Sequence, residues 1–137
     1  MYKKIMVPVD LAHVDRLGKA LTSAEDLAKH YGASVCYVGV TAPPPSDVAH
    51  TPEEYADRLE KFARAQSDRH GFVAMSRAYT SHDPAVELDD ILLRAITELD
   101  ADLVVMASHV PGIADHFFTS NAGYVAMHAK ISVFVIR

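Results

Sequence analysis

The chain has 137 residues, half of them hydrophobic, which fits one globular domain over residues 1–137 and excludes a disordered chain. Its formal net charge of −5, without a basic stripe, argues against a nucleic-acid or anionic-membrane surface. The single cysteine, Cys36, excludes an internal disulfide framework, and no apolar run is long enough for a signal peptide or a membrane span. We therefore expect a soluble cytoplasmic protein.

Short apolar runs alternate along the chain with segments of helical spacing. The predicted strands are Lys4–Val9, Ser34–Val40, Phe72–Tyr79, Asp102–Ala107 and Ser132–Ile136. In all of these strands except the third, nearly every residue is apolar, which is typical of strands covered on both faces. The predicted helices carry apolar faces that run from Leu17 to Tyr31, from Tyr55 to Ala63, from Leu88 to Leu99 and from Ala122 to Ala129.

Helix-ending and helix-starting residues agree with these elements. Gly32 and Gly71 lie just past the first two predicted helices, where glycine commonly ends a helix. The segment Thr51-Pro52-Glu53-Glu54 has the pattern of a capping box with proline at the first helical position, and Pro84 begins the third helix in the same way.

This alternation predicts an α/β fold: a single doubly wound five-stranded parallel sheet in strand order 3-2-1-4-5, with helices on both faces. The winding reverses between strands one and four, and ligands of such sheets bind at the carboxyl ends of these strands. Asp10 follows strand one, Ser108 and His109 follow strand four, and Val40 and Thr41 end strand two.

Each of three polar residues near this edge could have one of two roles, either in binding a ligand or in capping a helix. Asp10 could accept from a ribose hydroxyl or hold a metal-bound water, or it could cap the first helix. Ser120 and Asn121 precede the fourth helix, where they could cap it without a ligand. The same helix end could instead attract a phosphate.

The sequence supports a catalytic site less well than a binding site. Ser108 and His109 are neighbours at a strand end and point to opposite sides, and no Gly-x-Ser-x-Gly elbow surrounds them, so a serine hydrolase is disfavoured. Cys36 lies inside an apolar strand and is interpreted as a core residue. Among the eight histidines, His13 and His109 could converge with Asp10 on a metal ion, which keeps a metal enzyme as an alternative.

The chain resembles the universal stress protein family over nearly its whole length. The matching segments share their order and spacing with that family: residues 3–10, residues 33–40, Asp83-Pro84-Ala85, residues 101–106, His128-Ala129 and residues 132–137. The resemblance implies the same five-stranded sheet, a role in stress survival and regulation, and frequent dimerisation. Many members of the family bind ATP, whereas some bind AMP or nothing measurable.

The phosphate loop departs from the family pattern. Nucleotide-binding members carry Gly-x-x-Gly after strand four and a third glycine before a serine or threonine; the matching positions here are Ala107, Val110 and Thr119. The segments around Ser108-His109 and Ser120-Asn121 resemble a bacterial subgroup that can still bind ATP. Here Val110 replaces the arginine of that subgroup and Thr119 its last glycine, and His82 stands where many relatives have glycine. The first two changes predict weaker phosphate binding.

The resemblance thus implies a weak adenine-nucleotide site (ATP, ADP or AMP) without dedicated catalysis, and at most slow ATP hydrolysis. In it, Asp10 meets the ribose or a magnesium shell, Val9, Val40 and Thr41 border the adenine, and Ser108, Thr119, Ser120 and Asn121 face the phosphates. The full predicted set is Pro8, Val9, Asp10, Val40, Thr41, Met106, Ser108, His109, Thr119, Ser120 and Asn121. The alternative is a nucleotide-free dimeric interaction protein of the same family.

A homodimer is expected through the strand Ser132–Ile136. In the predicted strand order this strand lies at a sheet edge, is apolar, and lacks the proline or lysine that usually protects an edge. Two copies meeting antiparallel about a two-fold axis would satisfy its free backbone groups.

Overall fold

The computed structural model describes residues 1–108 and 121–137, and the side chain of Asn121 is not described. The elements in chain order are β1 Lys4–Pro8, the 3₁₀ helix η1 Leu11–Arg16, α1 Gly18–Tyr31, β2 Ser34–Thr41, α2 Pro52–His70, β3 Ala74–Thr80, α3 Pro84–Leu99, β4 Leu103–Ala107, α4 Asn121–His128 and β5 Ser132–Ile136. None of the helices in these two described ranges is long and apolar enough to cross a membrane.

The sheet has the predicted topology. Its five strands lie in the order β3-β2-β1-β4-β5, and every neighbouring pair is parallel. β1 lies at the centre, where Ile5 is in register with Val35 of β2 on one side and with Leu103 of β4 on the other. The carboxyl ends of β1, β2 and β4 therefore meet at one edge of the sheet, where the predicted site lies.

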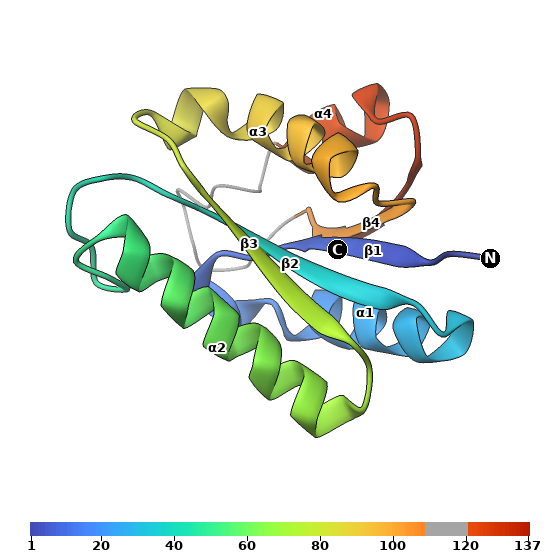
Figure 1. Cartoon of the computed structure of the whole chain (residues 1–137). Helices are drawn as coiled ribbons and strands as arrows, with labels where there is room; N and C mark the ends of the chain where they lie inside the picture. Colours follow the sequence, from blue (N-terminus) through green and yellow to red (C-terminus); the bar gives the residue numbers. More distant parts are fainter. Residues whose placement is uncertain (109–120) are drawn as a thin grey trace.

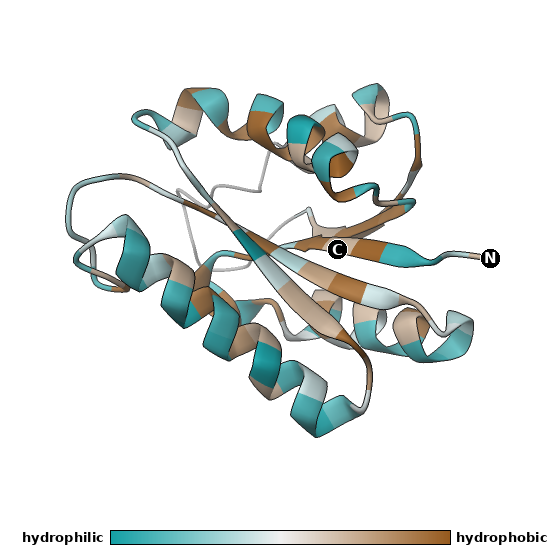
Figure 2. Cartoon of the chain, viewed as in Figure 1, coloured by the Kyte–Doolittle hydropathy of each residue, from teal (hydrophilic) through white to brown (hydrophobic). Residues whose placement is uncertain are grey.

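Helices cover both faces of the sheet, as expected. In Figure 1, α1 and α2 lie on one side and α3 and α4 on the other. Successive residues of β2 alternate between the two cores: Tyr37 packs toward α1 and α2, and Cys36 and Val38 pack toward α3. Figure 2 shows hydrophobic residues along the strands and polar residues on the outer sides of the helices, so the burial of the sheet holds the layers together.

The predicted helix ends are confirmed. Gly32 and Gly71 adopt the left-handed conformation just after α1 and α2, which a residue with a side chain would adopt at a cost. At the start of α2, the hydroxyl of Thr51 accepts a hydrogen bond from the N–H of Glu54 at 3.1 Å. The Glu54 carboxylate accepts from the N–H of His50 at 3.0 Å.

The structure differs from the sequence-based expectations at the third strand and in the segment that follows β1. The third strand begins at Ala74 and ends at Thr80, whereas the predicted strand ran from Phe72 to Tyr79. Phe72 is buried in the core, but Val73 is 65% exposed and lies outside the ladder. The 3₁₀ helix η1 was not predicted, because its six residues are too few to show a helical period.

Asp102 joins the start of β1 to the start of β4. Its carboxylate accepts from the N–H of Lys3 at 2.9 Å and from the N–H of Lys4 at 3.1 Å. We expect Asp102→Ala to lower the free energy of unfolding by about 1–2 kcal/mol, because two backbone donors lose a charged acceptor. Urea denaturation tests this. The matched variant Asp102→Asn keeps one acceptor oxygen and should lose less; an equal loss in both variants would contradict the explanation.

Candidate functional site

The carboxyl ends of the strands are held in place by backbone hydrogen bonds that continue beyond the ladders. The N–H of Val9 donates to the carbonyl of Val38 at 2.8 Å, and the N–H of Ser81 donates to the carbonyl of Thr41 at 2.8 Å. On the other side of β1, the N–H of Ser108 donates to the carbonyl of Ile136 at 2.8 Å. The edge is therefore built from the ends of consecutive neighbouring strands, which is where sheets of this type bind ligands.

Asp10 follows β1 and is held by the residues after it. One carboxylate oxygen, Oδ1, accepts from the N–H of Ala12 at 3.1 Å, and the other, Oδ2, accepts from Nδ1 of His13 at 2.8 Å. Asp10 is the residue that caps η1, so the structure confirms the capping reading of this residue. Each carboxylate oxygen can accept a second hydrogen bond, which leaves room for a ribose hydroxyl.

Tyr55 of α2 lies against this edge and was missed as a site residue, because the helical spacing of α2 marked it only as core. It is 5% exposed, and its ring packs over Gly39 of β2, where a side chain would clash with the tyrosine hydroxyl. Burial and the nearby charge of Asp10 raise the pKa of Tyr55 well above its usual value. The hydroxyl therefore keeps its proton. The sequence feature that could have pointed to this contact is Gly39, because a glycine inside a β-branched strand often marks a close approach by another group.

The other described residues of the predicted set fall into two groups. The first group is buried: Pro8, Val9 and Met106. A ligand at this edge would pack on these residues from above or bind their backbone groups. Val40 and Thr41 are partly exposed at the end of β2, and Ser108 is partly exposed at the end of β4. The Ser108 hydroxyl donates to the carbonyl of Ile136 at 3.3 Å.

The remaining predicted residues lie at the boundary of the described structure. His109, Thr119 and Ser120 are outside the described residues, and Asn121 is the first residue of α4. The proposed metal cluster is therefore placed only in part: Asp10 and His13 are in contact, and His109 is not described. Within residues 1–108 and 121–137, no group of three or more histidine, cysteine, aspartate or glutamate side chains is arranged to hold a metal ion.

The turn between β3 and α3 lies at the same edge of the sheet, and hydrogen bonds hold its polar side chains in place. The buried hydroxyl of Ser81 donates to the Glu87 carboxylate at 2.6 Å, and the N–H of Asp83 donates to the Ser81 hydroxyl at 3.1 Å. These bonds, first from Ser81 and then from the Asp83 backbone, lower the pKa of Glu87. His82 is exposed in this turn, beside the end of β2.

The prediction that Cys36 is a core residue is confirmed. Cys36 is buried in β2, and burial raises the pKa of its thiol to about 11. A thiol that stays protonated near neutral pH is a poor nucleophile, so Cys36 has no place in the chemistry of the site.

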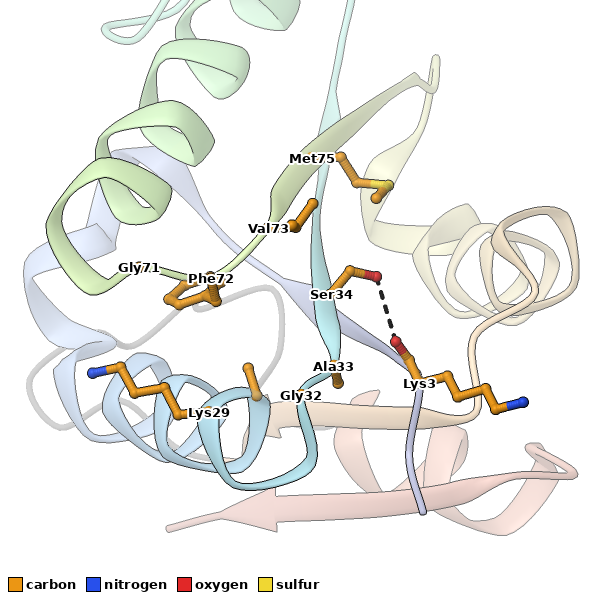
Figure 3. Close-up of a pocket in the computed structure, with 10 residues that line it drawn as sticks. Lys3, Lys29, Gly32, Ala33, Ser34, Gly71, Phe72, Val73 and Met75 are labelled. Carbon is orange, nitrogen blue, oxygen red and sulfur yellow. Dashed lines mark hydrogen bonds between the residues drawn. The ribbon is translucent and has the colours of Figure 1, made fainter.

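A hollow lies at the opposite, amino-terminal edge of the sheet. It is lined by the end of α1 and the segment before β3, including Lys3, Lys29, Ser34, Phe72 and Met75. In Figure 3 the ammonium groups of Lys3 and Lys29 point away from each other and out of the hollow, and the Ser34 hydroxyl donates to the Lys3 carbonyl at 3.4 Å. The hollow therefore lacks the converging charges of an anion site.

Known proteins resemble this chain over its full length. A family model described as the universal stress protein family matches residues 1–137. Universal stress protein G of Salmonella typhimurium is 31% identical over 144 residues, which cover all of both chains. The universal stress protein from Archaeoglobus fulgidus in complex with dAMP has a TM-score of 0.68 at 23% identity, over 99% of this chain and 98% of that one. A universal stress protein family protein from Arabidopsis thaliana with AMP bound has a TM-score of 0.70 at 15% identity, over 98% of this chain and 90% of that one.

Proposed function

Because the chain belongs to the universal stress protein family, we propose that it is a cytoplasmic stress-response regulator that binds an adenine nucleotide weakly at the carboxyl edge of its sheet. The observation that carries the proposal is the meeting of Asp10, Thr41 and Ser108 at the ends of three neighbouring strands. Structural neighbours with AMP and dAMP bound support the choice of an adenine nucleotide.

The proposed roles follow from position. Asp10 accepts from the ribose hydroxyls, the backbone of Val9 and the end of β2 border the adenine, and Ser108 lies on the side of the phosphates. The start of α4 adds the free N–H groups and positive dipole end that attract a phosphate. A magnesium ion that accompanied the phosphates would also find in Asp10 a hard oxygen ligand.

Weak binding follows from the sequence of the phosphate loop. Val110 and Thr119 occupy positions where nucleotide-binding relatives have arginine or glycine, so position 110 offers no charged partner for a phosphate and position 119 hinders close approach of the backbone. We further propose regulation through binding, with at most slow hydrolysis, since the sequence shows no general base placed for a water.

Thermal unfolding with and without nucleotide tests this function. We expect AMP, ADP or ATP with magnesium to raise the melting temperature, because a ligand at about a hundred times its dissociation constant adds roughly 2.7 kcal/mol, or some 5–10 °C for a domain of this size. Guanosine monophosphate serves as a control for nonspecific phosphate binding. No shift with any adenine nucleotide at several millimolar would refute the proposal.

The second candidate function is a nucleotide-free interaction protein. It is supported by the carboxylate of Asp10, which is already engaged by Ala12 and His13 without a ligand, and by the substituted glycine positions. The variant Val110→Gly/Thr119→Gly separates the two functions. Binding in the variant alone would mean that the native site has been abandoned, whereas equal binding would show that glycine is not required.

In either case we propose a homodimer through β5. Phe134 in this strand is 47% exposed, and β5 has a described neighbour, β4, on one side only. A groove lined by Tyr2, Tyr31 and the residues Ser132 to Val135 runs beside the strand and offers apolar surface to a second copy.

A further inference from the structure

β3 forms an open edge of the sheet: among the strands that the structure describes, its only neighbour is β2. The carbonyl of Val73, just before β3, accepts from the N–H of Val35 at 2.8 Å. Just after β3, the N–H of Ser81 donates to the carbonyl of Thr41 at 2.8 Å. Backbone groups of successive strand residues point to opposite sides, so the odd-numbered residues from 75 to 79 also bond to β2. The remaining residues of the strand direct their backbone groups outward: Ala74, Ser76, Ala78 and Thr80.

A hollow of about 430 Å³ lies beside this edge, between α2 and β3. The small residues of β3 lie on the α2 side, since Ser76 is in register with Tyr37, which packs toward α2. They leave space beside the outward backbone groups, which the side chains of an added strand can enter. Small side chains line the hollow from both elements: Ala63 and Ser67 of α2, and Ala74 and Ser76 of β3.

Apolar side chains reach solvent at the same edge. Val73 is exposed just before β3, and Met75, which points away from α2 in Figure 3, is 36% exposed. β3 contains neither the proline nor the lysine that commonly protects an edge strand from pairing. Free backbone groups beside exposed apolar side chains are the features by which an edge strand accepts an extended peptide.

The central residue of β3 is a cation. Arg77 is exposed, and none of the acidic residues in the described ranges forms an ion pair with it. On the same face, Glu98 of α3 accepts from the Tyr79 hydroxyl at 2.7 Å and lies 4.0 Å from Arg94. The nearby carboxylate is therefore engaged elsewhere, and the charge of Arg77 is left for a partner.

Other positive charges surround the edge. The hollow beside α2 and the hollow at the amino-terminal edge of the sheet are lined by Lys3, Lys29 and Arg64. The only acid in the described lining of the two, Glu60, is paired with Arg64 at 2.9 Å. The edge therefore has an excess of positive charge, although the chain has a net charge of −5. Such a surface is complementary to an acidic partner.

A second copy of this chain fits the edge less well. In the antiparallel register that pairs the whole of β3 with itself, Arg77 lies beside its own counterpart. Like charges directly opposite each other destabilise a pair of strands. The charges thus favour a different, acidic chain.

We propose that the β3 edge binds an acidic peptide in extended conformation, which adds to the sheet as a further strand. The outward backbone groups of β3 supply the hydrogen bonds, the hollow beside α2 takes side chains of the peptide, and Arg77 pairs with one of its carboxylates. This interaction goes beyond nucleotide binding, because it uses a strand edge and not the carboxyl ends of the strands.

Titration with a fluorescein-labelled peptide of alternating glutamate and valine, followed by fluorescence polarisation, tests the proposal on the full chain. A peptide with lysine in place of each glutamate is the matched control for charge. We expect the acidic peptide to bind wild type at least about tenfold more tightly than the lysine peptide, because only the acidic peptide complements Arg77 and the surrounding lysines.

Three variants locate the binding. Ser76→Pro removes an outward donor and leaves the bonds to β2, so it should weaken the acidic peptide by about tenfold. Arg77→Glu should weaken the acidic peptide by about tenfold and improve binding of the lysine peptide. Lys130→Glu makes the same change of charge at an exposed residue just before β5, at the other edge of the sheet, and should match wild type. If Ser76→Pro does not unfold cooperatively, Arg77→Glu decides alone.

Amide hydrogen exchange, measured by NMR, adds a readout for single residues. We expect the acidic peptide to slow exchange of the outward N–H groups of Ser76 and Ala78 at least about tenfold, whereas those of Met75 and Arg77 are already protected by β2. Failure of the acidic peptide to bind at about 1 mM would overturn the proposal, and so would binding that Arg77→Glu leaves unchanged. Protection that rises with protein concentration, without peptide, would assign the edge to a second copy instead. Each of these measurements is made without nucleotide, so its failure leaves the proposed function untouched.

Discussion

Replacing Gly39 with valine is expected to lower the free energy of unfolding by about 2–3 kcal/mol. A side chain at this position of β2 would clash with the hydroxyl of Tyr55, and ring atoms of Tyr55 lie 3.0 and 3.1 Å from the place of its first carbon. Tyr55 is buried, so its ring cannot move aside without displacing the start of α2 from the edge of the sheet. Urea denaturation measures the loss.

Gly18 provides the matched control. It begins α1, is exposed, and no heavy atom lies within 4 Å of the place of an added carbon. Gly18→Ala should therefore change stability by less than about 1 kcal/mol, in the stabilising direction. In the double variant Gly39→Ala/Tyr55→Phe, loss of the hydroxyl should recover part of the cost of Gly39→Ala alone. Equal costs in the presence and absence of the hydroxyl would show that the packing of Tyr55 on Gly39 is not the cause.

The arrangement of the sheet could be predicted because its determinants are local in sequence. Gly32, Gly71 and Thr51 each mark a helix end through the conformation or hydrogen bond of that single residue, and the structure has them in those roles. The strand runs are apolar on both faces, and one winding reversal then gives the order of the strands. The boundaries of β3 were less clear, since its burial alternates and Val73 is exposed although it is apolar.

The site could be predicted only in its location. Asp10, Thr41 and Ser108 lie at the edge that the topology indicates, but the packing around this edge depends on residues far apart in sequence. Tyr55 reaches Gly39 from a different layer of the fold, which no periodicity within α2 reveals.

The pair Asp10 and His13 is different, because its spacing of three residues is visible in the chain. That spacing kept open, as an alternative, a metal site shared with His109, which lies outside the described residues; between Asp10 and His13 the structure shows a hydrogen-bonded turn. The same residue types serve both purposes, and only the direction of the imidazole distinguishes them.

The second large effect concerns assembly: Val135→Pro is expected to convert a dimer into a monomer. The carbonyl of Ile136 accepts from Ser108 and so faces β4, and backbone groups of successive strand residues point to opposite sides. The N–H of Val135 therefore faces the open edge, and so does that of Val133. Proline at position 135 removes this outward donor and leaves the bonds to β4 in place.

For the proposed contact we choose the antiparallel register that is centred on Phe134. In this register Val133 of one copy lies opposite Val135 of the other, and each such pair exchanges two hydrogen bonds. Phe134 then lies at the two-fold axis, where its exposed ring meets its own copy.

We expect light scattering at micromolar concentration to give about twice the 15.0 kDa chain mass for wild type and the chain mass for Val135→Pro. Val135→Thr keeps the N–H and the branched shape and should remain dimeric. A monomeric wild type would refute the dimer, and a dimer that survives the proline would place the interface on another surface.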